Sequence, residues 1–597
     1  MCGLWSSLGF LVDRSAIDLV EHRGPDDSGW EVVQTSKGPL SLGSRRLAII
    51  DVSESGAQPM HLPKENLSIV YNGEVYNHAV LRDELKKNGY TFTSLTDTEV
   101  VLTAYAHWGI ECLEHFKGMF ALVIWDHDKD CLFVARDRFG IKPLYWFADG
   151  AGIAFSSEVK QFASIPEFNY RISKDVAYEY LSTGITDHRR ETMFSDVYQL
   201  MAGECVVLDL KTWQFDEEPH VQKWYDLEAK MTDVETGIDL ASSQFYDLLK
   251  RSVQEHLVSD VEVGCCLSGG LDSSTIIALA SENKALLRSV TAFFEDAEIN
   301  EKAFADDVIQ HMGIDGAFVQ PSLKGLISNI DAMHYSQDFP TASSSVFAQW
   351  CVFDAARKIG IKVMLDGQGA DEQLGGYSDS VSAYHASLIR DGKWIKFFGE
   401  LLARPLGQSP VSGFTRALIS ALPTFIQRLI RRIRGLETPE WLNAEFSAGR
   451  VSVLPSRNNL SAMSRDHFLK SSLPALLRYE DRNSMAHSIE ARVPFLDHHI
   501  VEFLQYVPHD QKISKGVTKF ILRRAIENFL PSSVVWRQDK IGFATPQSRW
   551  LSTENNRLVK ESVFDVLNRF PGMFDESKLR EMLENINNKN VDHQALW

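Results

Sequence analysis

The chain has 597 residues, of which 44% are hydrophobic and 24% charged, a composition typical of soluble globular proteins. This length exceeds what one hydrophobic core usually holds, so we expect at least two domains. The formal net charge of −19 argues against a nucleic-acid partner, because no excess of lysine and arginine is present to neutralise phosphates.

Short strand-like segments separated by Asn, Asp and Gly turns predict a sheet-rich domain over residues 2–212. The clearest of these segments are residues 67–71, 120–126, 131–136 and 152–156. A polar, acidic stretch at 213–219 precedes helical periodicity at 238–257, so we place the domain boundary in this interval.

The second domain, predicted over residues 238–597, alternates strands with helices. Strands are expected at 261–267, 289–294 and 361–365, and helices at 273–281 and 301–312. This alternation predicts a doubly wound parallel sheet whose ligand loops follow the strand C-termini.

The seven cysteines are scattered and contain no Cys-x-x-Cys pair, which indicates neither a disulfide framework nor a zinc site. The N-terminus lacks the basic flank and apolar stretch of a signal peptide, and no run of 18 apolar residues predicts a membrane span. We therefore expect a cytoplasmic protein.

Cys2 directly follows the initiator methionine. A thiol at a mature N-terminus can use its own α-amine, with a pKa near ~8, as general base, so it needs no separate histidine. This chemistry requires removal of Met1. The alternative is that cysteine occupies position two without a catalytic role.

Three further elements supply what cleavage of a glutamine amide requires. Arg46 can hold the α-carboxylate of glutamine, and Asp97 can hold its α-ammonium. The turn at Asn72-Gly73 can direct a side-chain amide and a backbone N–H at a tetrahedral oxyanion. Taken singly, Arg46 is more typical of a surface charge, Asp97 of a helix cap and Asn72-Gly73 of a hairpin turn.

This ordered set, together with residues 23–27 and 136–145, resembles the N-terminal-nucleophile glutaminase domain of the class II glutamine amidotransferases. The resemblance covers residues 2 to about 200 and implies a four-layered αββα sandwich. It also implies that Cys2 is the nucleophile and that Asn72 and Gly73 form the oxyanion hole. The glutamine-binding residues it implies are Arg46, Ile49, Ile50, Asn72, Gly73, Glu74 and Asp97.

The run Ser268–Ser274 lies between a predicted strand and a predicted helix. The N–H groups of Gly269 and Gly270, the following helix N-terminus and the hydroxyls of Ser268, Ser273 and Ser274 predict a polyanion site. Asp272 would repel an anion unless Mg²⁺ stands between them. The alternative is a serine-rich helix cap. The run resembles the pyrophosphate loop of the ATP pyrophosphatases, which cleave ATP between the α and β phosphates.

Asp371 follows the predicted strand at 361–365, where its carboxylate can share Mg²⁺ with Asp272. With the stretches 478–486, 490–497 and 537–543, the region from Ser242 to Trp597 resembles the synthetase domain of glutamine-hydrolysing asparagine synthetases. That resemblance implies an ATP site of Ser268–Ser274 with Cys266, Ala292, Asp366 and Gly367, and a Lys540 that stabilises charge as pyrophosphate leaves. Cys266 and Ala292 also fit plain core positions.

One position departs from the family pattern. Where the asparagine synthetases place a glutamate in a Gly-Glu-Gly-x-Asp-Glu loop, this chain has Gln368. A glutamate can accept a proton from attacking ammonia, whereas an amide cannot. Either another base serves, or the acceptor is a carboxylate other than aspartate.

Residues 414–435 place arginines among apolar residues at helical spacing. Such a stretch is typical either of a peripheral membrane contact or, more often, of a docked helix with a solvated face, which we favour here. Relatives with this domain pair are often homodimers.

The sequence thus predicts a mixed α/β and α+β enzyme of two domains. Cys2 hydrolyses glutamine to glutamate and ammonia, and ammonia passes through a water-poor tunnel. ATP then adenylates aspartate, pyrophosphate leaves, and the acyl-AMP is amidated to asparagine. The alternatives are the same chemistry on another carboxylate, such as a uronate of a surface polysaccharide, and a binding module without activity.

Overall fold

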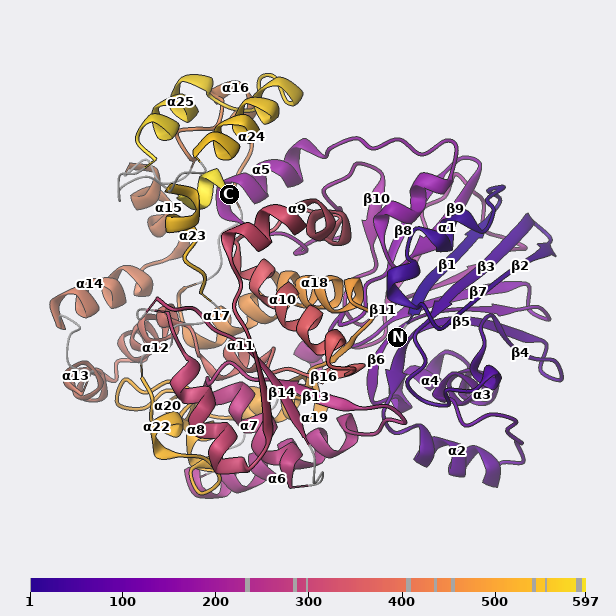
Figure 1. Cartoon of the computed structure of the whole chain (residues 1–597), viewed down its shortest axis with the longest axis horizontal. Helices are drawn as coiled ribbons and strands as arrows, with labels where there is room; N and C mark the ends of the chain where they lie inside the picture. The colour runs from indigo at the N-terminus through magenta and orange to yellow at the C-terminus, as the bar shows by residue number, and fades with distance from the viewer. Residues whose placement is uncertain are drawn as a thin grey trace.

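The computed structural model describes residues 2–230, 237–282, 287–296, 299–403, 410–433, 438–452, 457–538, 544–552, 556–586 and 593–597. Figure 1 shows the N-terminal sheets on one side and a larger helix-rich region, built around a third sheet, on the other. Within the described part of the chain, no helix is long and apolar enough to cross a membrane.

The N-terminal region contains two six-stranded antiparallel sheets. The first has the order β10-β8-β9-β1-β3-β2 and the second the order β12-β11-β7-β6-β5-β4. Their strands are β1 (Cys2–Leu8), β2 (Asp27–Thr35), β3 (Gly38–Arg46), β4 (Met60–Leu62), β5 (Leu67–Val75), β6 (Gly118–Asp126), β7 (Cys131–Arg136), β8 (Tyr145–Asp149), β9 (Gly152–Ser156), β10 (Val197–Gln199), β11 (Glu204–Asp209) and β12 (Val221–Lys223).

Alternating side chains divide these strands between an inner and an outer layer. Leu4 and Val70 belong to the core between the sheets, whereas Tyr71 packs with α2 (His78–Lys87) and α3 (Asp97–Trp108). Trp5 packs on the other outer face with α1 (Ser15–Asp18) and α5 (Lys174–Thr183). The four-layered αββα sandwich is therefore confirmed.

The C-terminal region is built on a five-stranded parallel sheet of order β15-β14-β13-β16-β17. These strands are β13 (Val263–Cys266), β14 (Arg288–Ala292), β15 (Asp315–Val319), β16 (Val363–Leu365) and β17 (Glu490–Arg492). The chain runs outward from β13 in one direction and then returns to the other side through β16. This reversal places a ligand crevice at the carboxyl ends of β13 and β16, and it confirms the doubly wound sheet.

Helices pack around this sheet and extend beyond it. They include α6 (Ile238–His256), α7 (Leu271–Ser281), α8 (Lys302–Met312), α9 (Leu323–Gln337), α10 (Ser345–Lys358), α11 (Ala370–Leu374), α12 (Ser378–Arg390), α13 (Trp394–Leu402), α14 (Pro410–Ala421), α15 (Thr424–Ile433), α17 (Leu460–Asp466), α18 (Leu473–Ala486), α19 (His498–Tyr506), α20 (His509–Lys512), α21 (Phe520–Ile526), α24 (Asn556–Arg569) and α25 (Glu576–Glu584).

The two domains share one continuous apolar core. Ile50, Met119 and Ile141 of the N-terminal domain belong to the same buried cluster as Leu267 and Val493. Strand β12 extends the second N-terminal sheet to Lys223, beyond residue 212. The domain bounds 2–212 and 238–597 otherwise stay a prediction.

Candidate functional site

Cys2 is the first residue of β1 and is buried. Its backbone N–H donates to the Asn72 side-chain oxygen at 3.0 Å, although 70 positions separate the two in sequence. This bond crosses from the first N-terminal sheet to the second, because Asn72 lies on β5. The structure therefore brings together the predicted nucleophile and one of the predicted oxyanion residues.

Asn72 is fully buried, and its side-chain Nδ2 has no hydrogen-bond partner among the described residues. An unpaired buried amide donor is costly unless a ligand satisfies it. Gly73 lets β5 approach β6 closely, because a Cβ there would lie 2.3 Å from the Met119 carbonyl oxygen. Both observations fit a site that binds an oxyanion in the space beside Cys2.

Gln58 is a contact of the thiol that the sequence did not reveal. Its side-chain nitrogen lies 3.9 Å from Cys2 Sγ, and its side-chain oxygen accepts from the backbone N–H of Tyr71 at 2.7 Å. The second bond fixes the amide so that its N–H faces the sulfur. No local pattern around Gln58 indicates this role, because the contact depends on the packing of distant strands.

Arg46 lies opposite Cys2 in the β1–β3 register. In this structure its guanidinium donates to the backbone oxygens of Ser53 at 2.8 Å and Ile50 at 3.4 Å, and it also bonds Asp51. Arg46 thus holds the loop that contains Ile49 and Ile50. The Ile49 carbonyl in turn accepts from Asp260 N at 3.1 Å, which ties this loop to the C-terminal domain.

Asp97 and Glu74 lie on the other side of the predicted glutamine site. The Asp97 carboxylate accepts from Tyr71 OH at 2.9 Å and from Val75 N at 3.0 Å, so it anchors the end of β5. Burial and the charge of Asp97 raise the pKa of Glu74 well above its ordinary value. Arg492 of β17 approaches Glu74 to 3.5 Å from the other domain. The glutamine-binding roles of these residues stay predictions.

Arg23 connects the thiol strand to the C-terminal domain. Its Nε donates to the Cys2 carbonyl oxygen at 3.1 Å, and its two terminal nitrogens bind Asp481 of α18 at 2.8 and 3.1 Å. Glu158 accepts from the same guanidinium at 2.9 Å. Arg23 lies within the 23–27 motif, but its partner on α18 is 458 residues away and had no sequence signal.

The predicted phosphate loop connects β13 to α7. The Ser268 and Ser273 hydroxyls lie 3.0 Å apart, and Gly270 N donates to the Ser268 hydroxyl at 3.2 Å. Gly269 has a φ of +74°, and a Cβ there would lie 2.9 Å from α8, so this position requires glycine. The Ser274 hydroxyl is buried without a partner among the described residues. These features fit a polyanion cradle at the N-terminus of α7.

Lys519 is the central charged residue of this crevice, and sequence analysis missed it. It forms ion pairs with both Asp272 and Asp371, the two predicted magnesium ligands. These charges keep the pKa of Lys519 raised despite its burial. Asp272 Oδ1 is buried without a hydrogen-bond partner in the described structure. Two converging carboxylates with a free oxygen fit Mg²⁺, which prefers oxygen ligands. Lys540 lies in residues 539–543, outside the described residues.

Asp366 follows β16 and accepts from Gly367 N at 2.6 Å. Glu480 of α18 lies beside both Asp366 and Gln368. Burial raises the pKa of Asp366 to about 6 and raises that of Glu480 well above its ordinary value. The charge of Asp366 contributes to the raised pKa of Glu480, so ionisation of one carboxyl group disfavours ionisation of the other. Cys266 lies against Asp366, and burial raises the pKa of its thiol.

Ala292 ends β14 and lies at the same sheet edge as Cys266, which ends β13. This edge is where a doubly wound sheet binds its ligand. The adenosine-pocket roles of Cys266, Ala292, Asp366 and Gly367 stay predictions.

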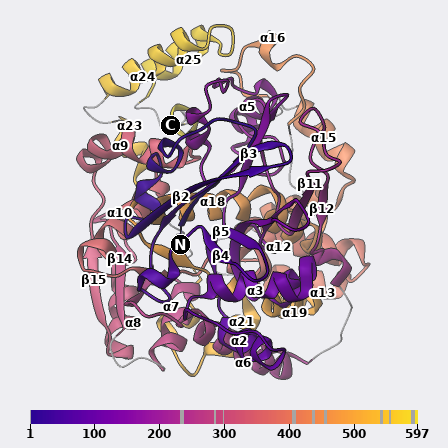
Figure 2. The ribbon, with the colours of Figure 1, turned by 90° about the vertical axis from the view of Figure 1, so that its right-hand side faces the viewer.

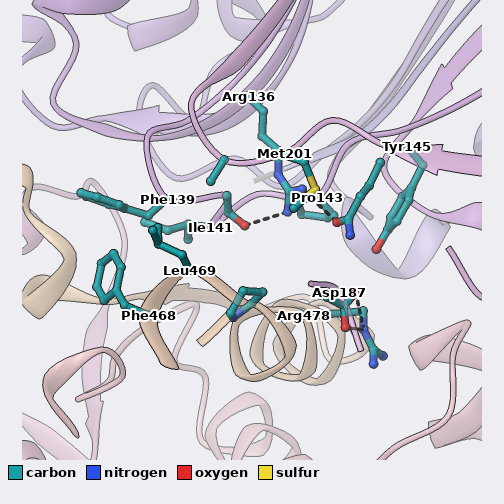
Figure 3. Close-up of a pocket in the computed structure, with 14 residues that line it drawn as sticks. Arg136, Phe139, Ile141, Pro143, Tyr145, Asp187, Met201, Phe468, Leu469 and Arg478 are labelled. Atoms are coloured by element: carbon teal, nitrogen blue, oxygen red, sulfur yellow. Dashed lines mark hydrogen bonds and ion pairs between the residues drawn. The ribbon is translucent and has the colours of Figure 1, made fainter. Parts of the chain in front are cut away.

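A separate pocket opens between the domains. Phe139 and Ile141 line it from the N-terminal side, and Phe468 and Leu469 face them from the C-terminal side (Figure 3). An Asp187–Arg478 ion pair of 2.9 Å lies at one end. No predicted site residue lines this pocket, so it is distinct from the two candidate centres.

Comparison with known proteins decides the family. A family model for asparagine synthase matches residues 244–597, and a model for a glutamine amidotransferase domain matches residues 1–224. The chain belongs to the asparagine synthase family. It is therefore a glutamine amidotransferase of the asparagine synthetase type, an ATP-using ligase.

The similarity to named relatives covers nearly the whole length of the chain. Asparagine synthetase [glutamine-hydrolyzing] 1 of Bacillus subtilis is 30% identical over 558 residues, covering 91% of this chain and 85% of the relative. Asparagine synthetase [glutamine-hydrolyzing] 3 of the same organism is 28% identical over 635 residues, covering 98% and 93%. Amidase chyE of Penicillium rubens is 28% identical over 640 residues, covering 95% and 90%.

Proposed function

We propose that this enzyme makes asparagine from aspartate, with glutamine as the nitrogen donor and ATP as the activating substrate. The observation that carries the proposal is that the Arg23 guanidinium donates hydrogen bonds both to the Cys2 carbonyl oxygen and to Asp481 of the synthetase domain. These bonds join the strand that carries the thiol to the synthetase domain. The names of the Bacillus subtilis relatives support aspartate as the acceptor.

In the first domain, the Cys2 sulfur attacks the glutamine amide, and Asn72 Nδ2 donates to the oxyanion that forms. Ammonia leaves, and water releases glutamate from the thioester. The base in this scheme is the α-amine of Cys2, so Met1 must be absent from the active protein. A measurement of intact mass tests that requirement.

In the second domain, the loop Ser268–Ser274 binds the phosphates of ATP while the acceptor carboxylate displaces pyrophosphate. Lys519 holds Asp272 and Asp371 together and supplies positive charge beside the leaving group. Asp272 and Asp371 would hold Mg²⁺, which would neutralise phosphate charge when bound. The product of this step is an acyl-AMP.

Ammonia then forms a bond to the acyl carbon, the bond from this carbon to AMP breaks, and the amine gives up a proton. Gln368 has no carboxylate to accept it, but Glu480 lies beside Gln368 and next to the carboxyl group of Asp366. We assign the proton-accepting role to this carboxyl pair. This assignment supplies a base in place of the glutamate of the family loop, so aspartate can remain the carboxylate substrate.

Ammonia must cross between the sites unprotonated, which requires a route that excludes water. The interface supplies apolar walls, because Met119 and Ile141 pack in one buried cluster with Leu267 and Val493. The seven cysteines all lie in the described part of the chain and form no disulfide there. Thiols without disulfides fit a reducing compartment, so we propose a cytoplasmic enzyme.

ATP–pyrophosphate exchange with a panel of carboxylates tests the acceptor. Aspartate is expected to stimulate exchange, whereas glucuronate and galacturonate are not. Stimulation by a uronate without a response to aspartate would establish the alternative amidotransferase. A protein inert toward every acceptor and toward glutamine would instead be a binding module.

A further inference from the structure

Helix α13 exposes an apolar stripe at the edge of the synthetase domain. Trp394, Ile395, Phe398 and Leu402 are exposed, with fractions of 93% for Ile395 and 79% for Leu402. Their spacing places them on one face of the helix, whereas Phe397 is fully buried in the core. This helix therefore uses one apolar face for folding and leaves a second one uncovered.

Helix α15 repeats the feature. Phe425, Leu429 and Ile433 follow one another at four-residue spacing and are 70%, 53% and 77% exposed. Between these helices, α14 exposes Leu418 and Ile419. All three helices lie along the edge of the molecule opposite the N-terminal sheets (Figure 1), and α13 and α15 lie on the same side in the perpendicular view (Figure 2).

The concentration of these side chains is unusual for the molecule. Nine of the 22 large exposed hydrophobic residues in the described structure lie on α13, α14 and α15. A concentration of exposed apolar side chains on neighbouring helices indicates an interaction site. The docked-helix expectation for 414–435 holds for α14, where Phe414 and Ala417 pack against the core. It is wrong for the outer face of α15, which nothing in the described structure covers.

The charge on this edge has the opposite sign to that of the chain. The helices α13, α14 and α15 carry five basic residues and one acidic residue, Glu400, which is buried. The whole chain has 80 acidic and 61 basic residues. Helix α15 alone carries Arg428, Arg431 and Arg432 and no acid. A positive, apolar edge on an acidic protein favours an anionic partner.

We propose that the edge formed by α13, α14 and α15 binds the surface of a membrane that contains anionic lipids. The apolar residues of α13 and α15 would enter the interfacial layer, and the exposed Arg428 of α15 would meet the headgroups. A second copy of the chain is a poorer occupant, because symmetric pairing of this edge would bring like charges together. The proposal does not depend on the identity of the amidated acceptor.

Co-sedimentation of the full-length enzyme with lipid vesicles tests this proposal. The enzyme is expected to bind vesicles of phosphatidylcholine and phosphatidylglycerol in a 3:2 ratio and to bind pure phosphatidylcholine much more weakly. The triple variant Phe425→Ser, Leu429→Ser and Ile433→Ser is expected to reduce binding on the order of tenfold or more. Arg428→Glu is expected to weaken binding mainly at low ionic strength, because salt screens surface charge.

The control variant carries Val80→Ser and Leu240→Ser, which remove exposed apolar residues from α2 and α6. It is expected to bind vesicles like the original enzyme. Glutamine hydrolysis should be unchanged in every variant, which reports correct folding. Absence of binding to the mixed vesicles would overturn the proposal. Equal binding by the triple variant and the original enzyme would also overturn it. A third contradicting result would be a concentration-dependent dimer that the original enzyme and the control variant form and the triple variant does not. The surface would then bind a second copy of the chain.

Discussion

Arg23 and Asp481 form a buried bidentate ion pair that joins the two domains at the carbonyl of the nucleophile. The guanidinium donates to Asp481 at 2.8 and 3.1 Å and to the Cys2 carbonyl at 3.1 Å. The charge of Arg23 lowers the pKa of Asp481 despite burial. The preceding residue on α18, Glu480, lies beside Gln368 in the loop of the synthetase site. One helix turn thus touches both candidate centres.

Asp481→Asn is expected to destabilise the protein by about 3–5 kcal/mol, because it leaves the buried Arg23 charge without its main partner. Urea unfolding measures this loss. Asp239→Asn is the matched control, since Asp239 pairs with Arg524 at 3.1 Å on the exposed surface and contributes at most about 1 kcal/mol. Equal losses in the two variants would contradict the bridging role of Asp481.

Asn72→Ala removes the free amide donor beside Cys2. The kcat of glutamine hydrolysis is expected to fall about 10²–10³-fold with a smaller change in KM, because the donor acts mainly on the transition state. Amidation supplied with ammonium should remain. Asn88→Ala, at an exposed helix end, is the control. A variant whose kcat stays within about twofold of the original would remove Asn72 from the oxyanion hole.

Glu480→Gln is expected to preserve ATP–pyrophosphate exchange and to slow amidation of the acyl-AMP about 10²-fold or more, because the proton acceptor is lost. The double variant Gln368→Glu with Glu480→Gln returns a carboxylate to the loop and should recover part of the rate. Loss of exchange in the single variant would indicate a structural role, and so would a lack of rescue in the double variant.

We expect acid to destabilise the domain interface around His256. Its ring packs against that of Tyr76 at a tilted angle of 37°, with centroids 4.0 Å apart, and burial lowers the pKa of His256 from 6.5 to about 4. Between these values the unfolded chain binds a proton that the native protein does not bind. The free energy of unfolding therefore falls as pH drops from 6.5 toward 4.

Urea titrations across this range, with His256→Gln as the comparison, measure the effect. In the variant, the slope of the unfolding free energy against pH should correspond to about one fewer proton taken up on unfolding. His487 has a similarly lowered pKa, so part of the slope remains. An unchanged slope in the variant would show that His256 does not contribute.

Local patterns predicted several strands and the phosphate loop, because hydrophobic runs and glycine turns act over a few residues. The turn predicted at Asn72-Gly73 is wrong, because both residues lie inside strand β5. Strands β7 and β9 match the expected bounds, and the predicted strand at 361–365 appears as the shorter β16. The pairing of Cys2 with Asn72 was expected only through the family resemblance.

Contacts between distant segments could not be predicted in this way. Lys519 was overlooked because its ion pairs join the N-terminus of α21 to Asp272 of α7 and Asp371 of α11, and no motif surrounds it. Gln58 and the partner of Arg23 are similar cases, since the residues they contact lie on other strands or in the other domain. The exposed face of α15 shows the opposite failure, because periodicity reports a face without saying whether anything covers it.

Transfer of nitrogen between the two centres is tested most directly with glutamine labelled with ¹⁵N in the amide. The enzyme is given this substrate, ATP and aspartate in a buffer that contains unlabelled ammonium. The product amide is expected to carry far more ¹⁵N than the bulk ammonium pool, and Cys2→Ala should incorporate only unlabelled nitrogen. A product labelled no more than the bulk pool would contradict the channelled, two-site account.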